Sequence, residues 1–305
     1  MDRLTELEVF AKIAEEESLT QAASALGISV SGVSRHLSAL EDRLQVRLIQ
    51  RTTRQMHLTL EGGRFAASAR EILASLRDAE DSISLVAAEP RGTLRVGASL
   101  SFAMLHLMPV VGLFRARYPQ VSVEVQSSNR YYDLVENGLD LAVRTRRVEV
   151  DSSVTIRKLA EVKRVLTASP DYIARHGMPE TPEDLRQRSM LLYTLADDWE
   201  RLHFCRDGEV TVLPVTGEVV SNDGQLLRQA ALDGLGIMVQ PAYVVYDDIQ
   251  AGRLVRVLPE WELPRLTMNI AFPSRSHLPA RTRLFIDTLV AYFADNRFEA
   301  QWAQV

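Results

Sequence analysis

Residues 18–44, SLTQAASALGISVSGVSRHLSALEDRL, decide the fold of the N-terminal part of the chain. Ser18 and Thr20 are candidate N-caps for a short helix over residues 21–26, because their hydroxyls can accept a hydrogen bond from a free backbone amide. Gly27 suits the left-handed end of that helix. A new helix starts almost at once, and two helices joined by a short turn that contains glycine are typical of a helix-turn-helix.

The second helix of this pair has an apolar stripe and a polar start. Ser29 can cap it, and the stripe recurs every three or four residues: Val33, Leu37, Leu40 and Leu44. Ser31, Ser34 and Arg35 lie off that stripe, near the end that enters the major groove in helix-turn-helix proteins. Hydroxyls and a guanidinium are suited to base edges. The helix pair alone leaves DNA binding and an ordinary helical bundle equally open.

The flanking segments favour DNA binding. Before the pair, apolar residues fall on one face of an amphipathic helix: Leu4, Leu7, Phe10, Ala11, Ile13 and Ala14. After it, Met56, Leu58 and Leu60 alternate with polar residues, which predicts the return strand of a small hairpin. Arg51 and Arg54 fall at its tip, where guanidiniums can bind phosphates or a narrow minor groove. A solvated turn with unpaired arginines is the alternative.

The most regular pattern is a heptad seam with alternating spacings of four and three: Phe65, Ala69, Ile72, Leu76, Ala79, Ile83 and Val86. A period of 3.5 residues predicts one helix of roughly 33 Å, whose apolar stripe needs another helix. We therefore expect a homodimer. Since two alanines weaken the seam, packing against the first helix of a partner is an alternative to a coiled coil. Pro90 and Gly92 end the helix and mark a domain boundary.

Beyond this boundary, strands and helices alternate. Strands are expected at residues 93–98, 121–125, 140–143, 162–167, 191–193, 236–239 and 267–272, helices at 102–117, 131–137, 225–232 and 282–294, and a hairpin around Asp207-Gly208. The alternation predicts a parallel or mostly parallel sheet with helices on both faces, followed by a second sheet. The last strand and helix can return to the first sheet.

Two facing α/β subdomains form a cleft, and ligands of such sheets bind outside the carboxyl ends of the strands. Residues 99–101 and 221–224 occupy that position, each at the start of a helix. Hydroxyls and amide protons at helix starts favour an anionic group such as a carboxylate. The same residue types are also preferred in plain N-caps, so both interpretations stay open.

Composition excludes several classes of protein. The 305 residues are 46% hydrophobic and 25% charged, as in globular domains and unlike disordered or fibrous chains. The acidic start and the lack of an apolar run of membrane-spanning length lead us to expect a cytoplasmic protein without a membrane partner. Cys205 is the single cysteine and cannot form an intrachain disulfide. The net charge of −5 argues against nonspecific coating of nucleic acid, although residues 28–58 hold five arginines against two acids.

Catalytic patterns are scarce. The six histidines show no metal-ligand spacing, and the sequence contains no GxSxG, P-loop or complete GxGxxG motif. We therefore expect a protein that is not an enzyme and that uses no metal and no cofactor.

Together these features resemble the LysR-type bacterial transcriptional regulators over essentially the whole chain. The N-terminal resemblance comes from Leu4-x-x-Leu7-x-x-Phe10, Ser18-Leu19-Thr20-x-Ala22-Ala23-x-x-Leu26, Val33-Ser34-Arg35-x-Leu37-x-x-Leu40-Glu41-x-x-Leu44, Arg47-Leu48-x-x-Arg51-Thr52-Thr53-Arg54 and Leu58-Thr59-x-x-Gly62. It continues through Pro109, Phe114, Tyr118-Pro119, Gly138-x-Asp140-Leu141-Ala142-x-Arg144, Ala168-Ser169-Pro170-x-Tyr172 and Gly234-x-Gly236-Ile237.

The resemblance implies a winged helix-turn-helix DNA-binding domain over residues 1–60, a linker and dimerisation helix over 61–89, and an α/β effector-binding domain over 90–305 that is similar to periplasmic substrate-binding proteins. Subdomain I would comprise roughly 92–161 and 267–305, and subdomain II roughly 162–266. It also implies a homodimer or homotetramer that binds imperfect palindromes in promoter DNA. A small-molecule effector would change the DNA bend or affinity, and RNA polymerase is a further candidate partner.

The family's functional surfaces map onto this sequence by position. The DNA-reading surface would comprise Ser31, Ser34, Arg35, His36, Arg51 and Arg54. The effector cleft would comprise Ser99, Leu100, Ser101, Phe102, Ser127, Ser128, Arg144, Tyr193, Asn222 and Gly236. Arg144 could instead pair with a local acid, and Phe102 could fill the core.

Four positions depart from the family's usual residues. Gln45 stands at a usual glycine, Ile49 at a usual phenylalanine, and Val30 and Gly32 replace glutamine or proline and alanine. Val30 removes a polar contact and could meet a thymine methyl group. Gly32 costs up to about 1 kcal/mol of helix stability relative to alanine but permits close approach to DNA.

Two other functions compete with an effector-controlled regulator. An architectural DNA-binding protein would need no effector cleft, so the long α/β module disfavours this function. A substrate-binding protein or enzyme with an N-terminal dimerisation helix would need no arginines on a wing, and Arg51 and Arg54 speak against that.

Overall fold

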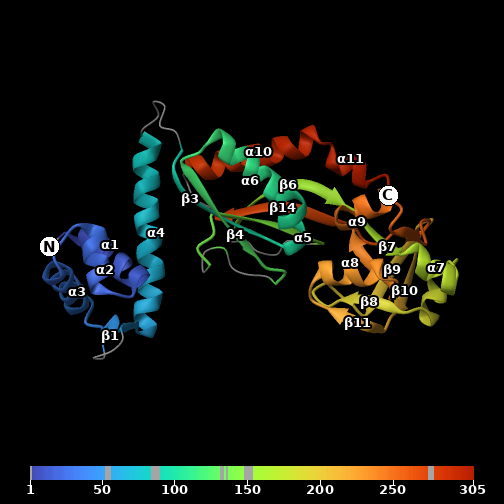
Figure 1. The fold of residues 1–305 in the computed structure, drawn as a ribbon, viewed down its shortest axis with the longest axis horizontal. Helices are drawn as coiled ribbons and strands as arrows, with labels where there is room; N and C mark the ends of the chain where they lie inside the picture. The colour runs from blue at the N-terminus through green and yellow to red at the C-terminus, as the bar shows by residue number, and fades with distance from the viewer. Residues whose placement is uncertain are drawn as a thin grey trace. The chain divides into compact units, whose positions relative to one another are not determined.

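The computed structural model describes residues 2–51, 56–83, 90–130, 134, 137–147, 154–273 and 278–305. The chain divides near residue 89 into two compact units, and each unit has its own hydrophobic core (Figure 1).

The N-terminal unit combines helices with a two-stranded hairpin. Its elements are α1 (Arg3–Glu16), α2 (Leu19–Leu26), α3 (Val30–Leu44), β1 (Ile49–Arg51), β2 (Met56–Leu58) and α4 (Leu60–Ile83). Ser18 Oγ accepts a hydrogen bond from Gln21 N, and Ser29 Oγ accepts one from Gly32 N. Gly27 ends α2 in the left-handed conformation at a φ of 66°. These caps confirm the predicted helix-turn-helix.

Apolar side chains from α1 to α4 and from the hairpin form the core of this unit: Val9, Phe10, Ile13, Ala22, Ala23, Val33, Leu37, Leu40, Leu48, Ile49 and Ala66. The predicted stripe of α3 is buried there, except that Leu44 is only partly buried. Burial of aliphatic and aromatic side chains is the main stabilising contribution to such a small domain.

A buried carboxylate joins α3 to the hairpin. Glu41 Oε1 accepts hydrogen bonds from Leu48 N at 2.8 Å and Ile49 N at 3.1 Å, and Arg47 Nη1 lies 3.2 Å from Oε2. Hydrogen bonds to a charged acceptor are stronger than neutral ones, so Glu41 fixes where β1 begins relative to α3.

The junction between β2 and α4 differs from the prediction. The expected strand through Leu60 is wrong at its end, because the strand stops at Leu58 and Leu60 already belongs to α4. Thr59 Oγ1 accepts a hydrogen bond from Gly62 N at 2.9 Å and so terminates the strand in favour of a helix. A Cβ atom at Gly62 would overlap the carbonyl oxygen of Leu48, which explains why glycine is needed there.

Part of the predicted heptad stripe of the long helix α4 packs against the core of the N-terminal unit. Ala69 is fully buried, and the Phe65 ring lies 5.5 Å from that of Phe10 on α1. Ile72, the next seam residue, is 49% exposed, and Leu76 is half-buried. The side chains of Ala79 and Ile83, and all of Val86, lie outside the described residues.

The first sheet of the C-terminal unit has the order β4-β3-β5-β14-β6. Its strands are β3 (Gly92–Ala98), β4 (Val121–Ser127), β5 (Leu141–Arg146), β6 (Val154–Val162) and β14 (Leu266–Pro273). β3 runs parallel to β4 and β5, whereas β14 is antiparallel to both of its neighbours. Only β14 opposes the other strands, so the expected mostly parallel sheet and the returning last strand are both confirmed.

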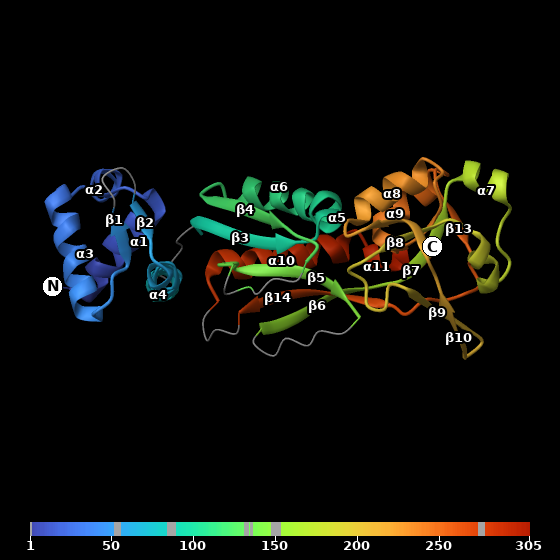
Figure 2. The ribbon, with the colours of Figure 1, turned by 90° about the horizontal axis from the view of Figure 1, so that it is seen from below.

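Helices from both ends of this unit pack on the first sheet (Figures 1 and 2). They are α5 (Leu100–Phe102), a π-helical turn over Ala103–Leu107, α6 (Met108–Arg117), α10 (Ala280–Asp295) and α11 (Phe298–Trp302). The Phe114 and Phe285 rings join α6 to α10 at 5.0 Å. The stretch Leu100–Arg117 is long and apolar enough, by length and composition, to cross a membrane, and 44% of it is buried inside this unit. The core helix of a globular domain meets the same two criteria.

The second sheet has the order β11-β8-β12-β7-β13. Its strands are β7 (Arg164–Ala168), β8 (Met190–Tyr193), β11 (Gly217–Ser221), β12 (Ile237–Pro241) and β13 (Val255–Val257). Around it lie α7 (Pro170–His176), a 3-10 helix (Pro182–Gln187), α8 (Gly224–Leu232), α9 (Ala242–Gln250) and the hairpin of β9 (Arg201–Arg206) and β10 (Glu209–Pro214). Asp207 and Gly208 make the predicted tight turn, with φ values of 52° and 85°.

The chain passes between the two sheets at two points. The strand predicted over residues 162–167 is two strands in the structure, since β6 ends at Val162, β7 begins at Arg164 and only Lys163 separates them. The second crossing leads from β13 to β14. The helix predicted over residues 131–137 falls almost entirely outside the described residues.

Candidate functional site

The start of α3 presents polar side chains outside the N-terminal core. Ser31 and Arg35 are exposed, and Ser34 is half-buried. The hydroxyls of Ser29 and Ser31 are 3.0 Å apart. His36 is half-buried, and its Nδ1 is enclosed without a hydrogen-bond partner in the described part of the chain. The predicted DNA-reading residues of α3 therefore lie near one helix start, and two of them are exposed.

The departures from the family pattern have local explanations. Gln45 ends α3 in the left-handed conformation at a φ of 54°, which accounts for the usual glycine, and its Nε2 donates to Asp42 O at 2.6 Å. A Cβ at Gly32 would lie 3.2 Å from Ser29 Oγ, so alanine would need a small shift. Ile49 is buried, and Val30 is 44% exposed.

The structure describes only the base of the predicted wing. β1 and β2 pair antiparallel, with Gln50 opposite His57 and Arg51 opposite Met56. The side chain of Arg51 and all of Arg54 lie outside the described residues, so their placement at the tip stays a prediction.

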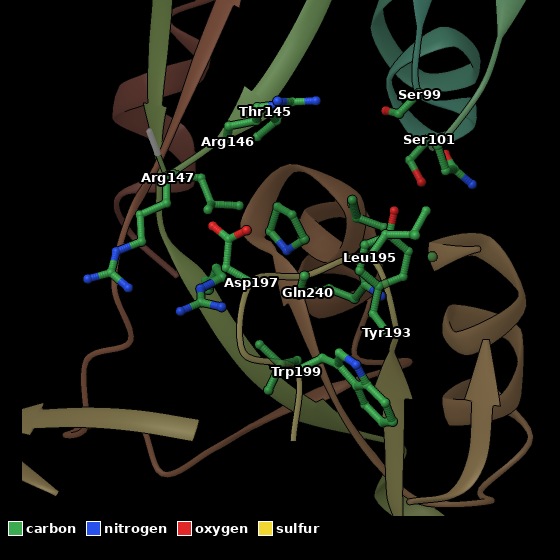
Figure 3. A pocket seen from close by; sticks show the side chains of 18 of the residues that line it. Ser99, Ser101, Thr145, Arg146, Arg147, Tyr193, Leu195, Asp197, Trp199 and Gln240 are labelled. Atoms are coloured by element: carbon green, nitrogen blue, oxygen red, sulfur yellow. The ribbon is translucent and has the colours of Figure 1, made fainter. Parts of the chain in front are cut away.

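A pocket of about 630 Å³ lies between the two sheets of the C-terminal unit. Ser99 and Ser101 border it on one side, and Arg146, Arg147 and Asp197 border it on another (Figure 3). Its walls thus come from segments that follow β3 and β5 of the first sheet, and from the second sheet and its hairpin. This is the position that strand order predicts for a ligand site.

Half of the predicted effector residues line this pocket: Ser99, Ser101, Ser128, Arg144 and Tyr193. The other half do not: Leu100, Phe102, Ser127, Asn222 and Gly236. Leu100 and Asn222 contribute backbone groups beside the pocket, because Leu100 N donates to Asn129 Oδ1 and Asn222 O accepts from Asn129 Nδ2. Ser127 is an exposed residue at the end of β4.

Phe102 and Gly236 have packing roles. The Phe102 ring is fully buried and lies 5.8 Å from His106 and 6.0 Å from Phe293, so it fills the core behind the pocket. A Cβ at Gly236 would overlap the carbonyl oxygen of Ser189 on the neighbouring chain segment. Neither residue needs a ligand to explain it.

The two predicted helix starts are already capped by the protein. Ser99 Oγ accepts from Phe102 N at 3.3 Å, and Asp223 Oδ1 accepts from Gln225 N at 2.8 Å and from Leu226 N at 3.2 Å. A carboxylate therefore already occupies the start of α8, which disfavours an anionic ligand there. Of the two interpretations, plain N-caps is the better one for these segments.

Hydrogen bonds connect the two sheets along this side of the pocket. Asn129 Nδ2 donates to Asp223 Oδ2 at 2.6 Å, and Gln225 Nε2 donates to Ser101 Oγ at 3.0 Å. Tyr243 on α9 bonds through its hydroxyl to Ser99 and Thr145 of the first sheet's layer. These contacts hold the two halves of the pocket in one arrangement.

Sequence reasoning missed most of the charged lining. Arg130, Arg146, Arg147, Arg164 and Arg201 line the pocket together with Asp197, Asp198 and His203. One local signal was available, because the run Arg144-Thr145-Arg146-Arg147 ends a predicted strand at its carboxyl end. No local sequence signal points to Arg164 or Asp197. Arg164 reaches the pocket through the chain crossing at Lys163, and Asp197 through the loop after β8.

Burial changes the titration of several lining groups. It raises the pKa of Tyr193 to about 12, so that hydroxyl stays protonated. Burial also raises the pKa of Tyr243, against the effect of its hydrogen bonds to Ser99 and Thr145. The hydrogen bond from His203 is the main cause that lowers the pKa of Asp198. For Arg164, burial lowers the pKa, and the nearby positive charge of Arg147 lowers it further.

The lining combines guanidiniums and hydroxyls with apolar side chains such as Leu195, Trp199 and Leu266. Such a surface is suited to binding a small organic molecule by charge, hydrogen bonds and apolar contact. No group of three or more histidine, cysteine or acidic side chains that could hold a metal ion occurs among the residues that the structure describes.

Comparisons with known proteins match both units. The pattern of the bacterial regulatory helix-turn-helix proteins of the lysR family matches residues 4–63, and that of the LysR substrate binding domain matches residues 87–294. The regulator PtxR of Pseudomonas aeruginosa is 35% identical over 289 residues, which are 94% of this chain and 91% of PtxR. The transcriptional activator AaeR of Escherichia coli is 32% identical over 295 residues, 97% of this chain and 95% of AaeR.

Solved full-length structures agree. CrgA, a LysR-type transcriptional regulator from Neisseria meningitidis, is 31% identical with a TM-score of 0.62, covering 94% of this chain and 97% of CrgA. The virulence activator AphB of Vibrio cholerae is 29% identical with a TM-score of 0.61, covering 95% and 99% of the two chains. With a helix-turn-helix in one unit and a substrate-binding domain in the other, this chain belongs to the LysR family of bacterial transcriptional regulators.

Proposed function

We propose that this protein binds promoter DNA sequence-specifically and that a small organic effector in the pocket between the two sheets controls its DNA bending or affinity. The observation that carries the DNA-binding part is the polar start of α3, where Ser31 and Arg35 are exposed while Val33 and Leu37 of the same helix are buried. A helix in that arrangement can place hydroxyl and guanidinium groups against base edges in the major groove.

The pocket supports control by an effector. Residues of both sheets line it, so a ligand that contacts both sheets favours one arrangement of them over others. A change in that arrangement would pass through α4 to the spacing of paired recognition helices in an oligomer. The expected oligomer is a homodimer or homotetramer in the cytoplasm, and Ile72, 49% exposed on α4, is one apolar residue available to a partner helix.

The two competing functions have less support. An architectural DNA-binding protein has no use for a lined pocket of about 630 Å³. An enzyme of the nucleophilic class would need a nucleophile beside its general base, and although His203 lies 2.8 Å from Asp198, no hydrogen bond joins its ring to a serine, threonine or cysteine side chain among the residues that the structure describes. The relatives are named as transcriptional regulators and not as enzymes.

Retention of fragmented host DNA tests the proposal. The full-length protein is incubated at physiological salt with fragments that include the region beside its own gene, and the retained DNA is sequenced. We expect a few enriched sites that share a dyad. Uniform weak retention would favour the architectural function, and no retention would favour a ligand-binding protein without a DNA target. Arg115→Ala, which removes an exposed arginine of α6, is the charge-matched control for variants of Arg35.

A further inference from the structure

The pocket between the sheets carries more positive than negative charge. Six arginines and two aspartates line it: Arg130, Arg144, Arg146, Arg147, Arg164, Arg201, Asp197 and Asp198. A concave surface that is dominated by one sign of charge concentrates ligands of the opposite sign.

Several of these charges already have partners. Arg201 Nε lies 3.2 Å from Asp198 Oδ1. Arg144 and Arg146 have interactions of their own within the chain. Three arginines differ, because Arg130, Arg147 and Arg164 form no ion pair with any residue that the structure describes. Of these, Arg164 is half-buried, and Arg147 is the arginine whose charge acts on it.

Arg147 and Arg164 both line the pocket, beside the crossing between the two sheets. Arg147 directly follows β5, and Arg164 begins β7, where its Nε donates to Pro264 O at 2.9 Å. Burial and the positive charge of Arg147 both lower the pKa of Arg164, and the charge of Asp197 opposes them. Two like charges that are held together repel each other, and an anion bound beside both would relieve that repulsion.

Uncharged polar groups line other parts of the pocket. Ser99 and Ser101 lie across it from Arg147, and Gln240 lies between these two sides (Figure 3). Gln240 is only 4% exposed, and its Nε2 has no hydrogen-bond partner among the described residues. A buried amide without a partner is destabilising, so this group also indicates a ligand, one that carries an acceptor oxygen.

We propose that Arg147 and Arg164 bind the anionic group of the effector, which is a carboxylate or a phosphate on an apolar body that contacts Leu195, Trp199 and Leu266. An acceptor oxygen on that body would bond to Gln240. This inference rests on the proposed function, since it takes the pocket as the effector site. It assigns the anionic group to the two arginines and no longer to the helix starts at residues 99–101 and 221–224.

Thermal unfolding of the full-length protein at constant ionic strength tests the inference. The probes are benzoate and phenyl phosphate, with benzamide as the uncharged counterpart of benzoate. We expect at least one of the two anions to raise Tm and benzamide to have no effect. A carboxylate site responds to benzoate, and a phosphate site responds to phenyl phosphate. If neither anion raises Tm more than benzamide does, the inference is wrong.

Variants test the two arginines. Arg164→Gln should weaken binding of the active anion at least tenfold by calorimetry, whereas Arg186→Gln, the same change on an exposed arginine outside the pocket, should leave binding unchanged. Equal binding by the Arg164→Gln protein would overturn the assignment. Retention of host DNA by the wild type is measured without added anion, so failure of the anion site is distinguishable from failure of DNA binding.

A measurement without ligand gives an independent test. Arg147→Gln removes the repulsion on Arg164, so it should raise Tm at low ionic strength, and added salt should reduce the gain. If Arg147 were instead a structural residue, its loss would lower Tm at every salt concentration, and that result would contradict the inference.

Discussion

The side-chain amide of Asn129 lies 2.6 Å from Oδ2 of Asp223, and this hydrogen bond joins the end of β4 in the first sheet to the end of β11 in the second. The other oxygen of the same carboxylate caps α8 through Gln225 N and Leu226 N. Asp223 thus has two separable roles, one in a helix cap and one in the link between the sheets.

We expect the two roles to separate in a double-mutant cycle. Asn129→Ala removes the link together with the hydrogen bonds of Asn129 to Leu100 N and Asn222 O, and should lower the free energy of unfolding by roughly 1–3 kcal/mol. Asp223→Ala removes the cap as well and should lower it by roughly 2 kcal/mol. Urea unfolding of both single variants and the double variant gives the coupling energy, which we expect at about 0.5–3 kcal/mol. Additive losses would show that the hydrogen bond contributes nothing.

A substitution at Gly62 tests the packing of α4 against the hairpin. Gly62→Ala would place a methyl group on the carbonyl oxygen of Leu48, and neither backbone can move away easily. We expect a loss of about 1–3 kcal/mol in the free energy of unfolding of the N-terminal unit, measured by denaturant titration of the full-length protein. Gly63→Ala is the matched control, because nothing lies within 4 Å of its Cβ position. That variant should gain up to about 1 kcal/mol in helix stability, and equal effects at the two positions would refute the explanation.

His106 makes stability depend on pH. Its ring lies 4.9–5.8 Å from those of Phe102, Tyr243, Phe293, Phe298 and Trp302, and neither nitrogen has a hydrogen-bond partner in the described chain. Burial lowers its pKa to about 4, below the ordinary 6.5. The unfolded chain therefore binds the proton first as the pH falls. The stability is complete above pH 6.5 and should drop by up to roughly 3 kcal/mol between pH 6.5 and 4.

The variant His106→Phe keeps an aromatic ring and removes the titrating group. Its unfolding free energy relative to the wild type should therefore rise steadily as the pH is lowered from 7 to 4, in parallel chemical denaturation experiments. A constant difference across this range would mean that His106 is protonated as readily in the folded protein as in the unfolded chain.

Much of the N-terminal unit could be predicted from the sequence because its signals are local. Ser29 and Gly27 define helix ends within a few residues, and the apolar spacing of α3 identifies its buried face without knowledge of the rest of the chain. The strand end was misjudged at Leu60, because its alternation with Met56 and Leu58 hides the cap that Thr59 provides.

The pocket could be predicted only in part. Ser99 and Tyr193 follow from strand order and resemblance, but Arg164 and Asp197 reach the pocket through long-range contacts that no local pattern encodes. Phe102 and Gly236 resemble site residues in sequence, yet packing against His106 and Ser189 determines their positions. A sequence motif does not distinguish a side chain that borders a cavity from one directly behind it.

Two arginines of the DNA-binding unit should respond differently to mutation. Arg54→Ala, on the predicted wing, should weaken binding to all sequences and reduce the salt dependence by about one counterion. Arg35→Ala, at the exposed start of α3, should reduce the discrimination between bases at the contacted pair by about 1–3 kcal/mol of binding free energy. Binding to a set of single-base variants of a retained site, measured at several salt concentrations, separates the two effects. Uniform loss from Arg35→Ala would contradict a base-reading role.

The most direct test asks whether a ligand in the pocket controls DNA binding. It measures the electrophoretic mobility of circularly permuted DNA fragments that carry a site enriched in the retention experiment. The mobility is measured with the wild type and with Arg164→Gln, without and with the anion that raises Tm. We expect this anion to change the DNA bend, footprint or affinity with the wild type and to change none of them with the variant. An anion that binds the wild type and leaves bend, footprint and affinity unchanged would contradict control of DNA binding by the pocket.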